Sequence, residues 1–414
     1  TSGTTGEPKG AVVKHKAFAQ MLLNVKKFTR NGFSEEDRTF TFLPLSHVFG
    51  RADSFMPLIF GWECVYAKSI DTIVDDIGLA EPTVMLAVPR IFEKIYAKVQ
   101  GNIKESNPLK QQLFEWAIEK AKDYFDEIDK DKAPSTSKII QYQLAYKLVF
   151  KKIYDLFGGR VRFFISGGAP LSSEIIEFLR YAGLTVLEGY GLTETVAPCA
   201  LNPLTKQIAG TVGQPTGDVE ISFADDGEIL VRSEAMFTEY LNNEDETRKA
   251  LDHEGWFHTG DIGHFTVDGY LKITDRKKDI IITSGGKNVA PQKIENMLKL
   301  QPHISQAVVV GDNRKYLTAL VGVEKESFIG ELESMDLSGD VPLEELVVHP
   351  EVVNIIKSEV ERVNQGLAKF ETIKKFYLMP IELSTDNYLT PSLKVKKKAL
   401  INDFDQEIDA LYRN

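Results

Sequence analysis

The sequence has few of the features that would place it outside the ordinary globular proteins. Only two of its 414 residues are cysteines, Cys64 and Cys199, and they stand far apart in no C-x-x-C arrangement. We therefore expect no disulfide framework, and this cysteine usage is typical of a reducing cytoplasm. No run of 18 apolar residues occurs, so the sequence predicts no membrane-spanning helix.

An excess of positive charge is also missing. Lys and Arg number 49 against 60 Asp and Glu, which gives a net charge of −11. This balance argues against a non-specific nucleic-acid binder, but local lysines can still bind a nucleotide. A hydrophobic content of 43% and a charged content of 26% are ordinary for a globular protein, and the length predicts two or more domains.

The first ten residues, in contrast, are rich in groups that can bind a phosphate. Hydroxyl and ammonium groups stand at Thr1, Ser2, Thr4, Thr5 and Lys9, between the glycines Gly3, Gly6 and Gly10. Glycines let a backbone turn tightly and bring its N–H groups close to an anion. The pattern G-x-x-x-x-G-K-[ST] does not fit, because Lys9 follows Pro8. The stretch predicts a phosphate loop of another kind, with a plain surface loop as the alternative.

The whole string T-S-G-T-T-G-E-P-K-G resembles the phosphate loop of the adenylate-forming superfamily, which includes acyl-CoA synthetases, nonribosomal adenylation domains and luciferases. The resemblance implies that this loop binds the β- and γ-phosphates of ATP and that Thr5 lies near Mg²⁺. The residues it assigns to ATP are Thr1, Ser2, Gly3, Thr4, Thr5, Gly6 and Lys9. In related families a strand and a larger N-terminal region precede this loop. We therefore interpret the chain as a fragment that lacks its beginning.

The next segments predict alternating helices and strands. Apolar spacing predicts a helix over 11–30, a strand over 39–43, and a buried strand followed by a helix over 83–96. Two amphipathic helices are expected over 109–130 and 137–157, as a helical insertion.

His47 lies in P-L-S-H-V-F, which in the resembling superfamily lines the carboxylate-substrate pocket. A packed core histidine is the alternative. The V-P-R-I-F-E-K-I segment after 87 is similar to the long-chain acyl-CoA synthetase branch.

Residues 160–188 predict a β-α-β unit, and ligand sites in such sheets lie at the carboxyl ends of the strands. By resemblance, Gly167, Gly168, Ala169 and Pro170 border the adenine, and Tyr190 covers the base together with Glu188, Gly189 and Gly191. A helix-entry turn is the alternative for the first group. Thr193 offers a hydroxyl to a phosphate, and Glu194 offers the oxygen ligand that Mg²⁺ prefers, unless it is a solvated turn residue.

Residues 210–275 predict an all-β part with Asp-Gly hairpin turns. Asp261, in W-F-H-T-G-D, resembles the superfamily's ribose-binding acid, since one carboxylate can accept both ribose hydroxyls. Arg276 resembles the arginine that also contacts the ribose, and Lys278 falls on the hinge position. The alternative for Asp261 is a turn residue, and the alternative for Arg276 and Lys278 is a charged surface turn.

The last part predicts a small α/β unit with helices over 291–300 and 350–365 and strands over 307–311, 317–323 and 376–381. The acidic stretch 330–349 predicts a variable loop. By resemblance, Gly286 lets the pantetheine of coenzyme A pass close to the backbone, and Lys394, in L-T-P-S-L-K-V-K, is the catalytic lysine of the long-chain branch. The alternative for this lysine run is a solvated or anion-attracting surface.

Taken together, the motifs predict an α/β fold. A large domain over 1–277 contains βαβ layers and a small distorted β-barrel region, and a mobile α+β domain over 278–414 rotates about Lys278. The resemblance implies that a long-chain fatty acid reacts with ATP, in the presence of Mg²⁺, to give acyl-AMP and pyrophosphate, and that coenzyme A then takes the acyl group.

Two alternatives remain. One is an acyl-AMP ligase that loads a carrier protein, which is disfavoured because no insertion follows the hinge; the other is an inactive nucleotide-binding fragment. Acyl chain length, oligomeric state and a peripheral contact with the inner face of the membrane stay open.

Overall fold

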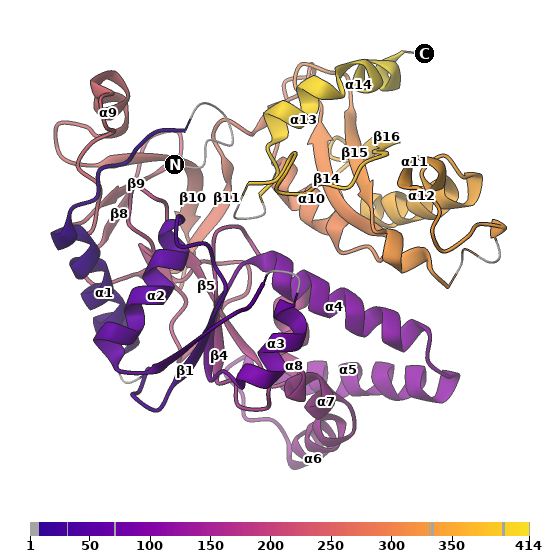
Figure 1. The fold of residues 1–414 in the computed structure, drawn as a ribbon, viewed down its shortest axis with the longest axis horizontal. Coiled ribbons are helices and arrows are strands. Elements are labelled where there is room, and N and C mark those ends of the chain that lie inside the picture. The colour runs from indigo at the N-terminus through magenta and orange to yellow at the C-terminus, as the bar shows by residue number, and fades with distance from the viewer. Residues whose placement is uncertain are drawn as a thin grey trace.

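A computed structural model describes residues 8–30, 32–69, 72–330, 332, 335–390 and 394–413. The residues predicted to form the phosphate loop, Thr1 to Gly6, lie outside these ranges. The described chain forms two lobes, a larger one that ends near 276 and a smaller one that begins near 281 (Figure 1).

A seven-stranded sheet is the centre of the larger lobe, in the order β2-β1-β3-β4-β5-β6-β7. The first five strands in this order are parallel, and β6 and β7 are antiparallel. Strand β3, V-M-L-A, is buried at all four positions, as a parallel strand covered on both faces should be. The bounds are β1 Arg38–Thr41, β2 Glu63–Tyr66, β3 Val84–Ala87, β4 Phe163–Ser166, β5 Thr185–Tyr190, β6 Ala200–Leu201 and β7 Gln214–Pro215.

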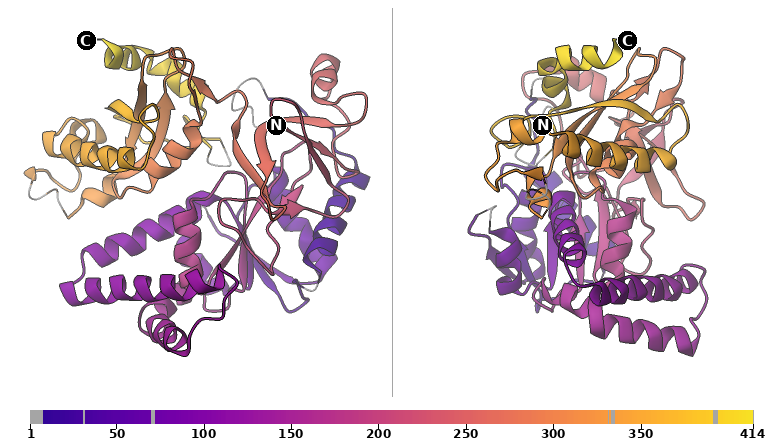
Figure 2. Two further views of the ribbon diagram at one scale, coloured as in Figure 1. Left: turned by 180° about the vertical axis from the view of Figure 1, so that it is seen from behind. Right: turned by 90° about the vertical axis from the view of Figure 1, so that its right-hand side faces the viewer.

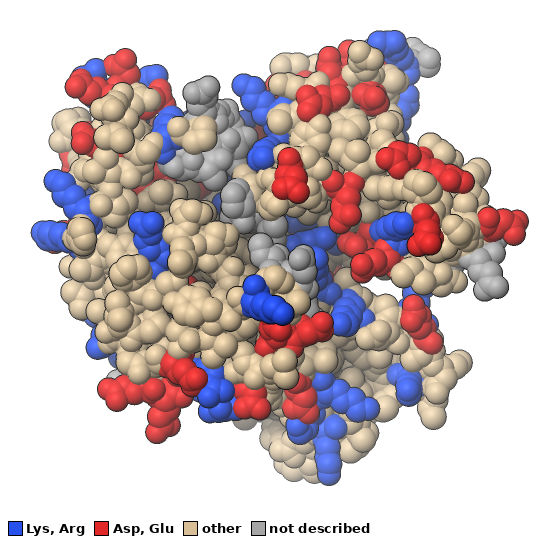
Figure 3. Space-filling model, viewed as in Figure 1, with Lys and Arg blue, Asp and Glu red and all other residues tan. Residues whose placement is uncertain are grey.

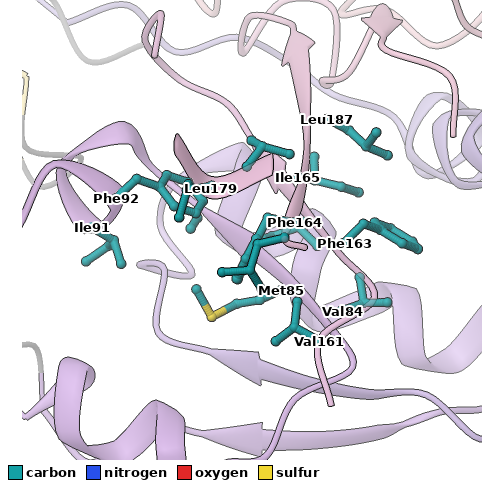
Figure 4. Packing of buried hydrophobic residues seen from close by; sticks show 14 of the residues in the cluster. Val84, Met85, Ile91, Phe92, Val161, Phe163, Phe164, Ile165, Leu179 and Leu187 are labelled. Atoms are coloured by element: carbon teal, nitrogen blue, oxygen red, sulfur yellow. The ribbon is translucent and has the colours of Figure 1, made fainter. Parts of the chain in front are cut away.

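Helices cover both faces of this sheet (Figures 1 and 2). Helices α1 and α2 pack together on one side, and α4, α5 and α8 pack together on the other. Figure 4 shows residues of α4 and α8 packed on the central strands, where Phe92 of α4 and Phe164 of β4 meet edge to face with ring centroids 5.2 Å apart. The bounds are α1 His15–Thr29, α2 Val48–Phe60, α3 Ile73–Ala80, α4 Pro89–Lys104, α5 Pro108–Ile128, α6 Thr136–Ala145, a π-helix Tyr146–Phe150, α7 Lys151–Asp155 and α8 Ser173–Tyr181.

A second, antiparallel sheet completes the larger lobe in the order β11-β10-β9-β8. Its strands are β8 Glu220–Phe223, β9 Glu228–Arg232, β10 Phe257–Phe265 and β11 Leu271–Arg276. The prediction that 210–275 is all-β is wrong at one point, because helix α9 Glu244–Ala250 lies between β9 and β10. The Asn243 side chain caps this helix by accepting from the Glu246 backbone N–H at 3.2 Å.

The smaller lobe is built on the sheet β14-β15-β16. Alternation along β14 sends Ala307 and Val309 into one apolar cluster with α10 and α12, and Val308 into another with α13 and α14. The bounds are β12 Ile281–Ile282, β13 Asn288–Val289, α10 Pro291–Lys299, β14 Ile304–Val310, β15 Leu317–Val323, a 3₁₀-helix Lys325–Phe328, α11 Leu343–Leu346, α12 Pro350–Gln365, β16 Ile373–Leu378, α13 Lys397–Asp403 and α14 Asp405–Tyr412.

Most predicted elements are confirmed, but several bounds and one loop prediction are wrong; the strand expected over 307–311, for example, begins at Ile304. The first helix begins at His15, since the backbone at Ala11 instead pairs with Tyr240. The helix expected over 137–157 is divided by a π-helix and ends at Asp155. The last strand lies three residues earlier than expected. The acidic stretch 330–349 includes α11 and buries Leu346, because its sparse apolar residues pack on the smaller lobe.

Both cysteines are free thiols, as the sequence predicts. Among the described residues, no helix has the length and apolar character that a membrane crossing would require.

Candidate active site

A cleft of about 2210 Å³ lies between the two lobes, at the carboxyl ends of the parallel strands. Figure 3 shows the notch between the lobes on one face of the molecule. Almost every described residue that the sequence assigns to a ligand lines this cleft. They are Lys9, His47, Gly167, Gly168, Ala169, Pro170, Glu188, Gly189, Tyr190, Gly191, Thr193, Glu194, Asp261, Arg276, Lys278 and Lys394.

Asp261 is the centre of a buried polar group on one wall. It lies on β10, is 5% exposed, and accepts a hydrogen bond from the Tyr190 hydroxyl at 2.6 Å. Its other oxygen accepts from Arg276 Nε at 3.1 Å. Burial raises the pKa of Asp261, and the charge of Arg276 opposes this rise. The residues expected at the base and at the ribose are therefore one connected group, whose carboxylate faces the cleft.

Glu194 also lines the cleft, four residues beyond the end of β5. Its carboxylate accepts from the hydroxyl of Tyr240 at 2.7 Å. Tyr240 also offers its ring face to the Lys9 ammonium, 4.9 Å from the ring centroid, and Lys9 pairs with Glu246 on α9. No group of three or more His, Cys, Asp or Glu side chains in the described ranges could hold a metal by itself.

The chain that leaves the predicted phosphate loop is fixed by backbone pairing. Leu241 N–H donates to the Gly10 carbonyl at 2.7 Å, and Val12 N–H donates to the Glu239 carbonyl at 2.9 Å. Thr238 N–H donates back to Val12 at 3.0 Å. This short antiparallel ladder brings Lys9 to Tyr240, whose hydroxyl contacts Glu194, although the three residues are far apart in sequence.

Lys394 enters the cleft from the smaller lobe. Its backbone N–H donates to Thr390 Oγ1 at 3.1 Å, and its carbonyl accepts from Thr390 N–H at 2.8 Å. Burial and the neighbouring charge of Arg276 lower the pKa of Lys394, while Asp261 opposes the change. The lysine therefore lies beside the Asp261 group, where an anionic ligand would favour its charged form.

His47 caps the start of α2, where its Nδ1 accepts from the Phe49 backbone N–H at 3.2 Å. A neutral imidazole that accepts at Nδ1 carries its proton on Nε2. Burial lowers the pKa of His47 to about 4, and the charge of Lys394 contributes. His47 is therefore a neutral hydrogen-bond donor at physiological pH.

We expect His47 to make the protein sensitive to acid. Its pKa is lower in the folded state, about 4, than the ordinary value of 6.5, so the unfolded state binds more protons between these values. The free energy of unfolding should be undiminished above pH 6.5 and should fall as the pH drops toward 4. The His47→Asn variant should lose less over this interval, by on the order of 1–2 kcal/mol after allowance for partial exposure. Urea unfolding at pH 7.5 and 4.5 measures this, and an equal loss in both proteins would contradict it.

The residues predicted to border the adenine line the cleft at the ends of β4 and β5. Glu188 is 6% exposed and accepts from the Gly210 backbone N–H at 3.2 Å, and burial raises its pKa to about 8. Gly191 has no room for a side chain, because a Cβ there would lie 2.6 Å from the Ala197 Cβ. Glycine at this position therefore keeps the chain close to the Ala197 turn.

Gly286 is the predicted site residue that the structure places elsewhere. It is exposed, has a φ of +74°, and does not line the cleft that contains Lys394. The structure thus has the lysine in the cleft and this glycine outside it.

Comparisons with known proteins agree with the geometry. The family model described as AMP-binding enzyme matches residues 1–241, and the model described as AMP-binding enzyme C-terminal domain matches 278–414. The long-chain-fatty-acid–CoA ligase FadD15 of Mycobacterium tuberculosis is 36% identical over 413 residues, which cover all of this chain and 68% of the ligase. Long-chain-fatty-acid–CoA ligase 5 of Rattus norvegicus is 35% identical, with 100% of this chain and 62% of the ligase covered.

The chain belongs to the AMP-binding enzyme family. Within the family, its similarity places it with the long-chain-fatty-acid–CoA ligases, although it spans only about two thirds of their length.

Solved structures agree with the fold of this AMP-binding enzyme. The adenylation domain of a carboxylate reductase from Mycobacterium chelonae has a TM-score of 0.75 at 24% identity and covers 100% of this chain and 59% of that chain. ATP-bound MatB from Rhodopseudomonas palustris has a TM-score of 0.65 at 23% identity, with 100% and 68% covered. The predicted fold class, α/β with a parallel sheet in the large domain and a separate smaller α+β domain after it, is confirmed.

Sequence reasoning missed Tyr240 and Glu246 of this AMP-binding enzyme. Both residues lie in the stretch that was predicted to be β-structure, yet they contact Glu194 and Lys9. A signal was present: Asn243 precedes three acidic residues and then Arg248 and Lys249, which is the charge order of a short capped helix. This signal predicts the helix, but its contact with Lys9 depends on tertiary packing between residues 237 positions apart.

Proposed function

We propose that this AMP-binding enzyme activates a long-chain fatty acid with ATP and then transfers the acyl group to coenzyme A. The observation that carries the proposal is the meeting of Lys394 with His47, Asp261 and Glu194 in one cleft. These residues come from the two ends and the middle of the chain. The 36% identity to a long-chain-fatty-acid–CoA ligase supports the choice of substrate class.

The first step joins two anions and needs a positive charge between them. A carboxylate oxygen attacks the α-phosphorus of ATP, the bond from that phosphorus to the bridging oxygen breaks, and pyrophosphate leaves. At an effective dielectric constant near 20, two charges about 4 Å apart repel by about 4 kcal/mol. The ammonium group of Lys394 would offset this repulsion, and the Nε2 proton of His47 would hold the carboxylate.

The Asp261 group fits the nucleoside part of ATP. Its carboxylate can accept from ribose hydroxyls while it keeps its bonds to Tyr190 and Arg276. The Tyr190 ring would cover the base, with Gly167 to Pro170 at its edge. Holding the nucleoside at several points aligns the α-phosphate for in-line attack.

The donors present also fit Mg²⁺ as an ion bound together with nucleotide phosphates. Mg²⁺ is commonly held by one or two carboxylates plus substrate phosphates, and Glu194 supplies one such carboxylate. Thr193 and Lys9 also line the cleft. The proposed loop ligands, including Thr5, lie outside the described residues. The ion would neutralise charge on the departing pyrophosphate.

The second step requires room for a larger substrate. The thiolate of coenzyme A attacks the acyl carbonyl, and the bond to AMP breaks. We propose that the domain 278–414 rotates relative to 1–277 about Lys278, which removes Lys394 from the cleft and brings Gly286 to it. Lys394 inside the cleft and Gly286 exposed outside it is the arrangement expected at one end of this motion.

The apolar part of the cleft suits the acyl chain. Its walls come from α1, α2 and the strand ends, and they include Val25, Ala52, Met56 and Leu86. Ala52 lies on α2 and is 1% exposed.

We expect Ala52→Leu to shorten the preferred acyl chain by roughly two to four carbons, because the three added carbons fill part of the apolar cleft. Ratios of kcat/KM across C8 to C18 acids measure this, since one methylene in an apolar pocket is worth about 1–3 kcal/mol.

Ala97→Leu is the matched control for this prediction, because Ala97 is exposed on α4. The control should keep the wild-type profile. An unchanged profile in Ala52→Leu would place the acyl chain elsewhere.

The proposed function itself is tested by CoA-thioester formation across fatty acids of graded length. We expect thioesters of long acids with release of AMP and pyrophosphate. Acyl-AMP without any thioester would favour the carrier-protein ligase, and neither product would favour a nucleotide-binding protein without activity.

A further inference from the structure

Two crossed ion pairs join the lobes on the side of the cleft next to α4. Arg90 reaches from α4 to Glu324, with 3.4 Å between Nη2 and Oε2, and also donates to the Ser305 carbonyl at 3.2 Å. Glu93, one turn later, accepts from Lys299 at 3.2 Å. Figure 1 shows α4 running beneath the smaller lobe, where these contacts form.

The order of charges makes this contact specific for one arrangement of the lobes. The larger lobe presents a cation and then an anion, and the smaller lobe presents the complementary anion and cation. Arg90 and Glu93 also lie 3.9 Å apart on the same helix. The side chains of Glu93 and Lys299 are 14% and 20% exposed, so solvent screens this pair less than an open surface pair.

The same part of the smaller lobe holds the segment of Lys394. Helix α10 carries Lys299 near its end and Glu295 one turn before, and Glu295 accepts from Lys397 at 2.7 Å. Val395 packs on the cluster formed by Val308 of β14 and its neighbours. Lys394 is therefore connected to α10 through Lys397 and to β14 through Val395. A contact that holds α10 and β14 against α4 also holds Lys394 in the cleft.

We infer that Arg90 and Glu93 are positioning residues for Lys394, which hold the smaller lobe in the arrangement for adenylate formation. The inference rests on the proposed function, in which this arrangement serves only the first half-reaction. Rotation about Lys278 has to separate both pairs before coenzyme A reacts. Weakening the pairs should therefore slow adenylate formation and leave the second half-reaction unchanged or faster.

A charge-swap cycle tests this inference. Glu93→Lys and Lys299→Glu each place like charges opposite one another, and the double variant restores an opposite pair. We expect each single variant to lose about five- to tenfold in adenylate formation, measured by ATP–pyrophosphate exchange, which is the scale of a partly shielded charge pair. Thioester formation from supplied acyl-AMP should not fall. The double variant should recover to within about threefold of wild type.

Equal loss of both half-reactions in the single variants, or no recovery in the double variant, would overturn the inference. A measurement that requires no enzymatic activity distinguishes a failure of this inference from a failure of the proposed function. Trypsin cleavage after Lys278, followed by mass spectrometry, should be faster in the single variants and return to the wild-type rate in the double variant. Wild-type protein that forms no acyl-AMP would overturn the proposed function, whereas unchanged hinge cleavage in every variant would overturn the positioning role.

Discussion

Replacing Lys394 by alanine should reduce acyl-adenylate formation by roughly 100- to 1,000-fold. In the proposed mechanism the lysine offsets a repulsion of about 4 kcal/mol between the carboxylate and the α-phosphate, and each 1.4 kcal/mol of barrier is a factor of ten in rate. ATP–pyrophosphate exchange with palmitate measures this loss. Thioester formation from supplied acyl-AMP should stay within about threefold of wild type, because the proposed rotation removes the lysine from the cleft in that step.

Lys374→Ala is the control for this variant, since Lys374 is an exposed lysine of the same lobe on β16. It should behave as wild type in both half-reactions. A Lys394→Ala protein that loses both half-reactions equally would contradict the assignment of Lys394 to adenylation alone.

Asp261→Asn should weaken the binding of ATP and AMP by roughly 10- to 100-fold. The substitution keeps the shape of the side chain but removes its charge and one acceptor, and a hydrogen bond to a charged group contributes about 1.5–3 kcal/mol. The KM for ATP should rise accordingly, and the KM for the fatty acid should change less than about threefold. Isothermal titration calorimetry with AMP measures the affinity directly.

Asp225→Asn provides the control, because Asp225 is an exposed aspartate in the turn before β9. It should bind AMP like wild type. If Asp261→Asn bound AMP normally, or if its fatty-acid KM rose as much as its ATP KM, the ribose role of Asp261 would be wrong.

The sequence predicts the centre of the fold well because its signals there are local. The apolar runs of β3 and β4 are strands buried at all four positions, and motifs of the site directly follow β4 and β5. The strand 317–323 and the helix 350–365 agree with the structure at both ends. Since the carboxyl ends of parallel strands meet at one edge of a sheet, Gly168, Tyr190 and the residues beside them come together as expected. Their roles toward the ligands stay predictions.

Features that depend on distant partners could not be predicted. The sequence predicts that Ala11 lies in the helix that follows it. Its backbone instead pairs with that of Tyr240, which is 229 residues away, and is therefore extended. Arg90 and Glu324 are 234 residues apart and share no local pattern. The hydrogen bond from Tyr240 to Glu194 joins two motifs that look independent in the sequence. Such contacts arise from tertiary packing, which a one-dimensional pattern does not record.

The most direct test of the account follows an isotope from the fatty acid. Purified protein is incubated with palmitate labelled with ¹⁸O in both carboxylate oxygens, together with ATP, Mg²⁺ and coenzyme A, and the products are measured by mass spectrometry. If the carboxylate attacks the α-phosphorus, palmitoyl-CoA keeps one ¹⁸O and AMP carries the other, while pyrophosphate carries none. Unlabelled AMP, or ¹⁸O in a released phosphate, would contradict adenylate formation in this cleft.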